Sequence, residues 1–456
     1  MSLRKRVVLR LACGLALWLG CAQPLSADPR SSFVIGQITA HNAGLSPAIR
    51  DEKYRDMSDS AVAFFRGTAH LYWADWGAST QLAQFGSAQT RIWLQGDAHT
   101  DNQGSFANSV GALVYDLNDF DESVIGDYQL DLWRMATSLV LVARQNGGFS
   151  AAEEAALTDA FTDGYLDALS SYAGSDSERT RTFTADNTNG LLDDFLKDVA
   201  ADRSRKKLLD KYTLKSGATR VFDIHNDDLA PLSDTTVQAL RDALPAYGAT
   251  LSGALSYSSS YFKLKSAAGR LHAGLGSLGA PRYYLLIEGP SSSADDDRIL
   301  DVKAQTSPSA FATLDPDARS ATDAASHGDA AERTVKAARS LGYKVDDHLG
   351  TLSALGLRFS VRERSAYADT FDTGELTSMT RITKLAAQWG AVLATAHARA
   401  DRDADPAVIP FDFEQEVLKK LGSSKNLFRA RIRQIASSYA TQVEIDFAAF
   451  LSWQAS

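Results

Sequence analysis

The sequence predicts an α+β fold, and three features of its patterning support this class. Segments with apolar residues at helical spacing are mixed with short apolar runs typical of strands. The strand-like runs form two groups, one between residues 91 and 115 and one between residues 282 and 364. The order lacks the regular strand–helix alternation of a parallel sheet, and no segment repeats at a solenoid period.

The elements are predicted from periodicity and from residues that begin or end helices. Helices are expected where apolar residues recur every three or four positions: residues 58–76, 128–145, 150–172, 191–211, 330–341, 375–399 and 411–450. Strands are expected at short apolar runs: residues 91–95, 112–115, 282–288, 299–304 and 357–364. Ser58 or Asp59 is the expected N-cap of the first helix, and Ser150 caps the third.

The N-terminus has the pattern of a secretory signal peptide over residues 1–27. A basic stretch at residues 4–10 precedes an apolar run at residues 11–20, and Leu-Ser-Ala at 25–27 offers a cleavage site. We therefore expect an exported protein, periplasmic or secreted after cleavage. Lipoprotein anchoring at Cys21 and a first core helix are the alternatives. The mature chain has no apolar run of the roughly 18 residues that a membrane span needs.

Cysteine content and charge exclude several kinds of site from a chain cleaved after residue 27. Cys13 and Cys21 are the only cysteines, so the mature chain would have no disulfide, thiol nucleophile or thiolate metal ligand. Loss of four basic residues would change the net charge from −9 to −13. We expect no nucleic-acid partner, because such a site replaces counterions with Lys and Arg.

Two polar clusters follow the first two predicted strands. The first is GDAHTDN at residues 96–102, and the second is DLNDFDE at residues 116–122. Carboxylate and amide oxygens are typical ligands of hard cations such as Mg²⁺, so two clusters joined by a hairpin predict a metal site. The alternative is a pair of acidic turns whose side chains cap only their own backbone.

The spacing of these clusters is similar to that of a kinase catalytic loop. In such loops an Asp is followed five residues later by an Asn, and a metal-binding Asp lies on the next hairpin. Asp97, Asn102 and Asp116 have this order. Asp97 is the predicted catalytic base, while Asn102 and Asp116 would hold Mg²⁺ against the phosphates. Asp119 and Asp121 are further candidate metal ligands.

A candidate phosphate-binding segment lies downstream, where GLGSLG at residues 274–279 leads into a strand. A dinucleotide-binding turn would open a helix, so that interpretation is disfavoured. Lys303, on a following strand, is the candidate phosphate-binding lysine, and Glu332 is its candidate partner. The alternatives are a flexible loop, a solvated lysine and a solvated helix face. The glycines proposed to contact the nucleotide are Gly274, Gly276 and Gly279.

Three further residues are predicted to support the site rather than to react. His99 would orient the first polar cluster, and Arg66 and Arg134 would pair with its acids.

These motifs together resemble the bacterial DUF2252 family, an uncharacterised group with a protein-kinase-like fold. The similar stretches run from near residue 57 to residue 450 and include FFRG at 64–67, GDAH at 96–99, NDFDE at 118–122 and AHAR at 396–399. GDAH also resembles the loop of aminoglycoside- and choline-kinase-like enzymes. The family commonly has Lys-Glu-Ala where this chain has Lys303-Ala304-Gln305, and its pattern does not fix a partner for Lys303.

The resemblance implies a two-lobe, kinase-like fold whose element order is circularly permuted and whose C-lobe is rich in helices. Residues 28–250 would carry the catalytic loop and part of the C-lobe. Residues 251–370 would form the N-lobe with the glycine loop and the lysine. Residues 371–456 would complete the C-lobe.

The predicted function is an exported, Mg²⁺-dependent phosphotransferase that uses ATP or another nucleotide and an unknown acceptor, a small molecule or a protein. Nucleoside triphosphates are expected to be scarce outside the cytoplasm, so an inactive kinase-like binding module is the first alternative. A metal-dependent phosphoesterase ranks third, because no Asp-x-His pair precedes Gly96-Asp97 and no Gly-Asn-His turn is present to complete a two-metal site.

Overall fold

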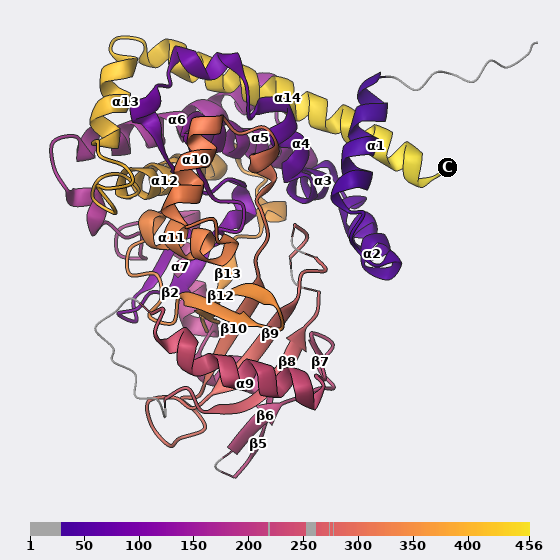
Figure 1. The fold of residues 1–456 in the computed structure, drawn as a ribbon. Helices are drawn as coiled ribbons and strands as arrows, with labels where there is room; N and C mark the ends of the chain where they lie inside the picture. Colours follow the sequence, from indigo (N-terminus) through magenta and orange to yellow (C-terminus); the bar gives the residue numbers. More distant parts are fainter. Residues whose placement is uncertain (1–28, 218, 252–260, 273, 277) are drawn as a thin grey trace, which may run out of the picture.

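Helices and sheets occupy different parts of the molecule, which confirms the predicted α+β class (Figure 1). The structure is a computed structural model that describes residues 29–456 apart from residues 218, 252–260, 273 and 277. The predicted signal peptide, its cleavage site and Cys21 lie outside the described residues. No helix in the described part of the chain is both long and apolar enough to cross a bilayer.

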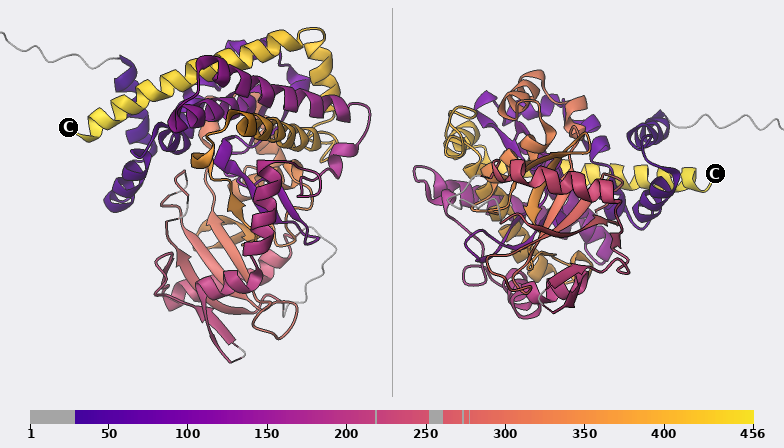
Figure 2. Two further views of the ribbon diagram at one scale, coloured as in Figure 1. Left: turned by 180° about the vertical axis from the view of Figure 1, so that it is seen from behind. Right: turned by 60° about the horizontal axis from the view of Figure 1, so that its bottom comes forward.

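The largest sheet has six strands, and each strand is antiparallel to its neighbours. In spatial order they are β11 (Gly350–Ala354), β12 (Leu357–Glu363), β10 (Arg298–Ala304), β9 (Arg282–Ile287), β8 (Leu264–Arg270) and β7 (Leu229–Ala230). One face packs against α9 (Asp234–Gly248), as Figures 1 and 2 show. Leu300 and Val302 of β10 are buried in that core. Because side chains alternate along a strand, Asp301 and Lys303 project from the other face.

The helices gather at the opposite end of the molecule (Figure 2). They are α1 (Pro29–His41), α2 (Pro47–Met57), α3 (Ala61–Gly67), α4 (Ala69–Trp76), α5 (Gln129–Asn146), α6 (Ala151–Tyr172), α7 (Leu191–Asp202), α10 (Pro316–Ala325), α11 (Ala330–Leu341), α12 (Met379–Arg399), α13 (Phe413–Leu421) and α14 (Lys425–Gln454). Helix α8 (Arg205–Tyr212) instead packs against the large sheet, where Leu209 and Tyr212 share a core with Tyr284 and Leu286 of β9. The predicted cap is present at α6, where Ser150 accepts the backbone N–H of Glu153 and the Glu153 carboxylate accepts from Ser150.

Three predicted helices are each divided in two. The segment 58–76 breaks at Thr68, whose hydroxyl donates to the Phe64 carbonyl at 2.7 Å, and its N-cap is Ser60 rather than Ser58 or Asp59. The segment 191–211 breaks before Ser204, which caps α8. The segment 411–450 breaks at Gly422, whose φ of 50° lies in the left-handed region that favours glycine. Apolar periodicity continues across each break, so it did not reveal these ends.

Short antiparallel pairs position the two polar clusters. β1 (Arg91–Leu94) pairs with β4 (Val124–Asp127), and β2 (Gln103–Ala107) pairs with β3 (Leu113–Leu117) and β13 (Asp369–Thr370). A separate hairpin joins β5 (Thr213–Ser216) to β6 (Thr219–Phe222). The β2–β3 register opposes Gln103 and Leu117, so the end of the first cluster lies beside the second.

Helices α6 and α12 approach so closely that glycine is required at their contact. A Cβ on Gly390 would lie 2.1 Å from the Phe161 carbonyl oxygen, and a Cβ on Gly164 would lie 2.0 Å from the Ala387 carbonyl oxygen. Both obstacles are backbone atoms, which cannot rotate away. This contact fixes the path of α12, whose C-terminal end reaches the functional site.

We expect Gly390→Ala to lower the free energy of unfolding by about 1–3 kcal/mol, because the added methyl group overpacks this contact. Gly36→Ala in α1 is the matched control, since a Cβ there meets no atom within 4 Å. It should be neutral or stabilising by up to about 1 kcal/mol, the helix preference of Ala over Gly. Urea unfolding of both variants measures the difference, and equal effects would contradict the close-contact argument.

Candidate functional site

A cavity of about 1020 Å³ lies between the large sheet and the β2–β3 hairpin. Residues from distant parts of the chain line it, including both polar clusters and the strand that carries the candidate lysine. Six of the predicted site residues are among them: Arg66, Asn102, Asp119, Asp121, Gly274 and Lys303. The structure therefore brings Asn102, Asp119, Asp121 and Lys303 together at one cavity, whereas Asp97 and Asp116 lie outside its lining.

The first polar cluster turns on Gly96, where the backbone has a φ of 83°. A Cβ at this position would lie 2.0 Å from the Glu122 carbonyl oxygen, so a side chain here would collide with the second cluster. The Trp73 indole N–H donates to the Gly96 carbonyl at 2.9 Å. The glycine thus permits close contact between the two clusters.

A buried carboxylate that was not a predicted site residue anchors the same turn. Asp131 of α5 accepts the backbone N–H of Gln95 at 2.7 Å and that of Gly96 at 3.0 Å. His397 Nε2 lies 3.2 Å from the Asp131 carboxylate, and Tyr165 contacts His397 Nδ1 at 2.8 Å. His397 lies in the AHAR stretch that resembles the family, yet only the three-dimensional positions of His397 and Asp131 show that they hold this loop.

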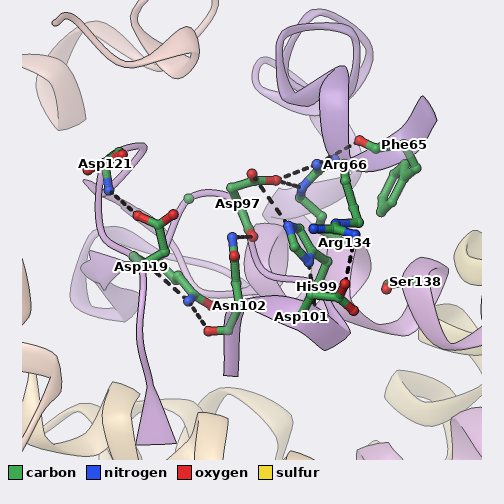
Figure 3. Close-up of polar contacts among 12 residues, drawn as sticks. Phe65, Arg66, Asp97, His99, Asp101, Asn102, Asp119, Asp121, Arg134 and Ser138 are labelled. Atoms are coloured by element: carbon green, nitrogen blue, oxygen red, sulfur yellow. Dashed lines mark hydrogen bonds and ion pairs between the residues drawn. The ribbon is translucent and has the colours of Figure 1, made fainter. Parts of the chain in front are cut away.

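Asp97 is paired with a buried arginine, as Figure 3 shows. Arg134 Nε donates to Asp97 Oδ1 at 2.6 Å, and the Arg134 side chain is fully buried with its guanidinium 4.1 Å from the Phe65 ring centre. Burial raises the pKa of Asp97, and the charge of Arg134 opposes this effect. Asp97 itself does not line the cavity. The predicted pairing of Arg134 with an acid of the loop is present.

The other two supporting residues also contact the first cluster. His99 is buried, and its Nδ1 accepts the Asp101 backbone N–H at 3.2 Å while Nε2 lies 3.7 Å from Asp97 Oδ2. Arg66 Nη1 lies 2.8 Å from Asp101 Oδ2. Both interactions restrain the loop.

Asn102 has its amide orientation fixed by the loop itself. Its Nδ2 donates to the Asp97 carbonyl oxygen at 2.9 Å, which leaves the side-chain oxygen as the acceptor that can face a cation. Gln95 Nε2 donates to the carbonyl oxygens of both Asn102 and Asp119, at 2.6 and 3.1 Å. This shared contact holds the two polar clusters together.

Asp119 follows β3 and extends toward the first cluster. Its Oδ1 accepts the Asp121 backbone N–H at 3.3 Å, and its charge contributes to the raised pKa of Asp97. An amide oxygen at Asn102 and a carboxylate at Asp119 are suitable ligands for Mg²⁺, which usually takes one or two protein carboxylates together with substrate phosphates and water.

Lys303 contacts Asp121 across the cavity. Its ammonium group pairs with Asp121 Oδ2, and Gln305 Nε2 donates to Asp121 Oδ1 at 2.8 Å. Burial acts to raise the pKa of Asp121, but the Lys303 charge and the two hydrogen bonds outweigh it and lower that pKa. The lysine is thus held at the cavity wall by an acid of the second cluster.

Asp116 lies elsewhere, although it was a predicted metal ligand. Its Oδ2 accepts from Arg399 Nη1 at 2.8 Å and its Oδ1 accepts the Leu117 N–H at 2.9 Å. It does not line the cavity. Asp116 is still inside β3, whereas Asp119 follows the end of the strand and is free to turn inward. We therefore assign the ligand role in our proposal to Asp119.

Glu332 and two of the glycines also lie away from the cavity lining. Glu332 is 3.1 Å from His327 and 3.5 Å from Lys336, which agrees with the solvated-face alternative rather than with a pair to Lys303. A Cβ on Gly279 would contact Leu45 near α2, and one on Gly276 would meet no atom within 4 Å. Only Gly274 of the three reaches the cavity.

A buried lysine and a partly buried glutamate beside the loop were not predicted. Glu122 accepts the Ser309 backbone N–H at 2.6 Å, and burial together with the charge of Asp97 raises its pKa to about 7. Lys53 of α2 is 2% exposed, and burial lowers its pKa to about 8 against the attraction of Glu122. The sequence around Lys53 is polar, so nothing in it indicated burial.

The fold and site define an α+β protein in which two polar loops and a strand lysine meet at one large cavity. The family model described as "Uncharacterized protein conserved in bacteria (DUF2252)" matches residues 46–453. The chain therefore belongs to the DUF2252 family. No curated protein and no solved structure matches it significantly.

Proposed function

We propose that this protein is an exported, Mg²⁺-dependent phosphotransferase with a kinase-like fold in permuted order. The observation that carries the proposal is the pair formed by Lys303 and Asp121, which are 182 residues apart in the chain and meet at the cavity that also holds Asn102 and Asp119. At about 1020 Å³ the cavity is at the upper end of the range for small-molecule sites, so a nucleotide and part of an acceptor fit.

The order of elements around the cavity supports the kinase-like assignment. The segment with Gly274 connects antiparallel strands β8 and β9, Lys303 lies on the next strand, and helix α11 leads to β11 and β12. The connection after β12, residues 364–368, also lines the cavity. This succession of glycine loop, lysine strand, helix and connecting segment is the one that the family resemblance implies for a nucleotide site.

Each of the residues at the cavity has a role in this proposal. Asn102 and Asp119 would hold Mg²⁺, which would offset charge on the phosphates during transfer. Lys303 would contact the phosphates, with Asp121 keeping its ammonium group at the wall. Gly274 would allow the backbone to approach the nucleotide. Asp97 would accept the proton of the acceptor hydroxyl.

A binding module without catalytic activity is the second candidate, and one observation favours it. The Asp97 carboxylate is paired with Arg134 and lies outside the cavity lining. Asp97 could therefore act as a base only after a rearrangement that exposes its carboxylate to the cavity. A phosphoesterase is not proposed. Among the described residues, no group of three His, Asp or Glu ligands converges at the two polar clusters.

The test is Mg²⁺-dependent binding of ATP to the mature chain, measured by isothermal titration calorimetry. We expect Asp119→Asn to weaken binding at least 10-fold in Mg²⁺ and to leave binding in EDTA unchanged, because the substitution removes a metal ligand. Asp347→Asn is the control, since Asp347 lines the cavity but belongs to neither polar cluster. No ATP binding by the wild-type chain would refute the proposal. ATP binding without transfer to any acceptor pool would favour the binding module.

A further inference from the structure

A second group of carboxylates lies at the end of α12, where the chain turns into α13. Six acidic residues form two sets, and within each set the ligand oxygens lie within 4.8 Å of one another. The first set is Asp401, Asp412 and Glu414, and the second is Asp176, Glu178 and Asp403. None of the six lines the cavity described above. The cluster is therefore separate from the proposed phosphotransferase site.

Two of these carboxylates are buried with an oxygen that has no hydrogen-bond partner. Glu178 is 1% exposed and Glu414 is 2% exposed, and Oε2 of each lacks a donor among the described residues. Both residues belong to groups of converging ligand atoms. A buried carboxylate without a donor costs several kcal/mol unless a cation compensates it.

The protein supplies little positive charge to this cluster. Arg402 pairs with Asp412 at 3.0 Å, and Arg179 lies 3.7 Å from Asp176, but both arginines are about half exposed at the rim. Arg399 donates to the backbone oxygen of Glu178 rather than to its carboxylate.

The loop between the two helices has the spacing of a calcium-binding sequence. Asp401, Asp403 and Asp405 occupy positions 1, 3 and 5 of a twelve-residue segment whose last residue is Asp412. The EF-hand loop places its ligands at positions 1, 3, 5 and 12, among others. Pro406 replaces the turn glycine of that loop, so the backbone path differs even though the acidic spacing is similar.

We propose that this cluster is a Ca²⁺ site, with Asp401, Asp412 and Glu414 as its first ligands. Glu178 and Asp403 would complete the oxygen shell. Ca²⁺ accepts six to eight oxygens in flexible geometry, whereas Mg²⁺ requires a near-ideal octahedron and retains water. A convergence of carboxylates from a helix end, a loop and a 3₁₀ turn (Ser177–Arg179) therefore suits Ca²⁺ better.

A cation here would stabilise the base of the proposed catalytic loop without contacting it. It would tie the C-terminal end of α12 to α13 and to the 3₁₀ turn. Two residues before the end of α12, His397 contacts Asp131, which holds the Gln95–Gly96 turn. The expected role of the ion is structural, so its effect should appear as stability and not only as activity.

The direct experiment is calorimetric titration of the EDTA-treated, desalted mature chain with CaCl₂ and, separately, MgCl₂. We expect one Ca²⁺ per chain with a Kd between about 10⁻⁶ and 10⁻³ M, the range from sensor sites to extracellular modules. Mg²⁺ should bind at least 10-fold more weakly. The melting temperature should rise with the Ca²⁺ concentration, because the ion binds only the folded chain.

Two isosteric variants localise the site. Glu414→Gln and Glu178→Gln should each weaken Ca²⁺ binding at least 10-fold and remove most of the Ca²⁺-dependent rise in melting temperature. Glu416→Gln, on the same helix but paired with Lys419 outside the cluster, should behave as the wild type. In EDTA both cluster variants should be at least as stable as the wild type, since each loses a buried unpartnered charge. This comparison separates lost binding from misfolding.

Absence of saturable Ca²⁺ binding in the metal-free wild type would overturn the inference, as would unchanged binding in both cluster variants. Asp119→Asn should retain Ca²⁺ binding measured without nucleotide. The proposal of a Ca²⁺ site and the proposal of a phosphotransferase site can therefore be refuted independently of each other.

Discussion

Exchange of Arg134 for Met is expected to lower the free energy of unfolding by about 3–5 kcal/mol, the cost of removing one partner of a buried ion pair. The Arg134 side chain is fully buried, and the Asp97 side chain that it contacts is 14% exposed. Met fills much of the same volume and keeps the contact with the Phe65 ring. The loss should therefore come mainly from the uncompensated carboxylate and less from a cavity.

The destabilisation should depend on pH in a defined direction. Burial raises the pKa of Asp97 above 3.8, and Arg134 limits that rise, so the pKa increases further without Arg134. A carboxyl group whose pKa is higher in the folded than in the unfolded state favours folding at low pH, and this contribution is lost as the pH rises through the folded-state value. The difference between Arg134→Met and wild type should thus be small near pH 4 and larger at pH 7.

Urea unfolding at both pH values provides the measurement. Arg381→Met is the control: the side chains of Arg381 and its partner Asp194 are 57% and 61% exposed, so a loss of at most about 1 kcal/mol is expected. The double variant Asp97→Asn/Arg134→Met should recover part of the lost stability, because it removes the unpaired charge. A pH-independent loss in Arg134→Met, or no recovery in the double variant, would contradict the ion-pair argument.

The sequence carried enough information to predict which segments meet at the site. The polar clusters follow strands, and the β2–β3 hairpin between them has a register that brings Asn102 beside Asn118. The sequence placed Lys303 on a strand but did not show which face of the sheet its side chain occupies. That face is known only from the structure, in which Leu300 and Val302 of the same strand pack against α9. Local sequence patterns thus identified the segments that form the site, and tertiary packing determined where their side chains point.

The choice between Asp116 and Asp119 could not be made from spacing. Both residues come after the turn of the hairpin that follows the first cluster, and both carry a carboxylate that can bind Mg²⁺. The end of β3 decides between them: strand alternation directs Asp116 toward Arg399 at the end of α12, a residue 283 positions away in the chain. Such a partner is invisible to local reasoning. Lys53 is a similar case, because its burial depends on the packing around α2, which contacts α3.

Exchange of Lys303 for Met is expected to reduce any phosphotransfer activity by roughly 10²–10³-fold, the usual effect of removing one charged or hydrogen-bonding group from a developing negative charge. Lys303 projects into the cavity from β10, and its ammonium group is held there by Asp121. If it contacts phosphate, Lys303→Met should also weaken ATP binding in Mg²⁺.

A purely structural role for Lys303 leads to different expected results from a phosphate-binding role, so an experiment can distinguish the two roles. Asp121→Asn removes the acid but leaves the amine, and Gln305 can still donate to the side-chain amide oxygen that takes the place of the carboxylate. If Lys303 acts on phosphate, Asp121→Asn should retain measurable ATP binding while Lys303→Met loses it. If Lys303 serves only to neutralise Asp121, both variants should alter stability and neither should alter ATP binding selectively. Calorimetric titration with ATP beside thermal melts of both variants distinguishes these outcomes, because the first role changes binding at constant fold and the second changes the fold itself.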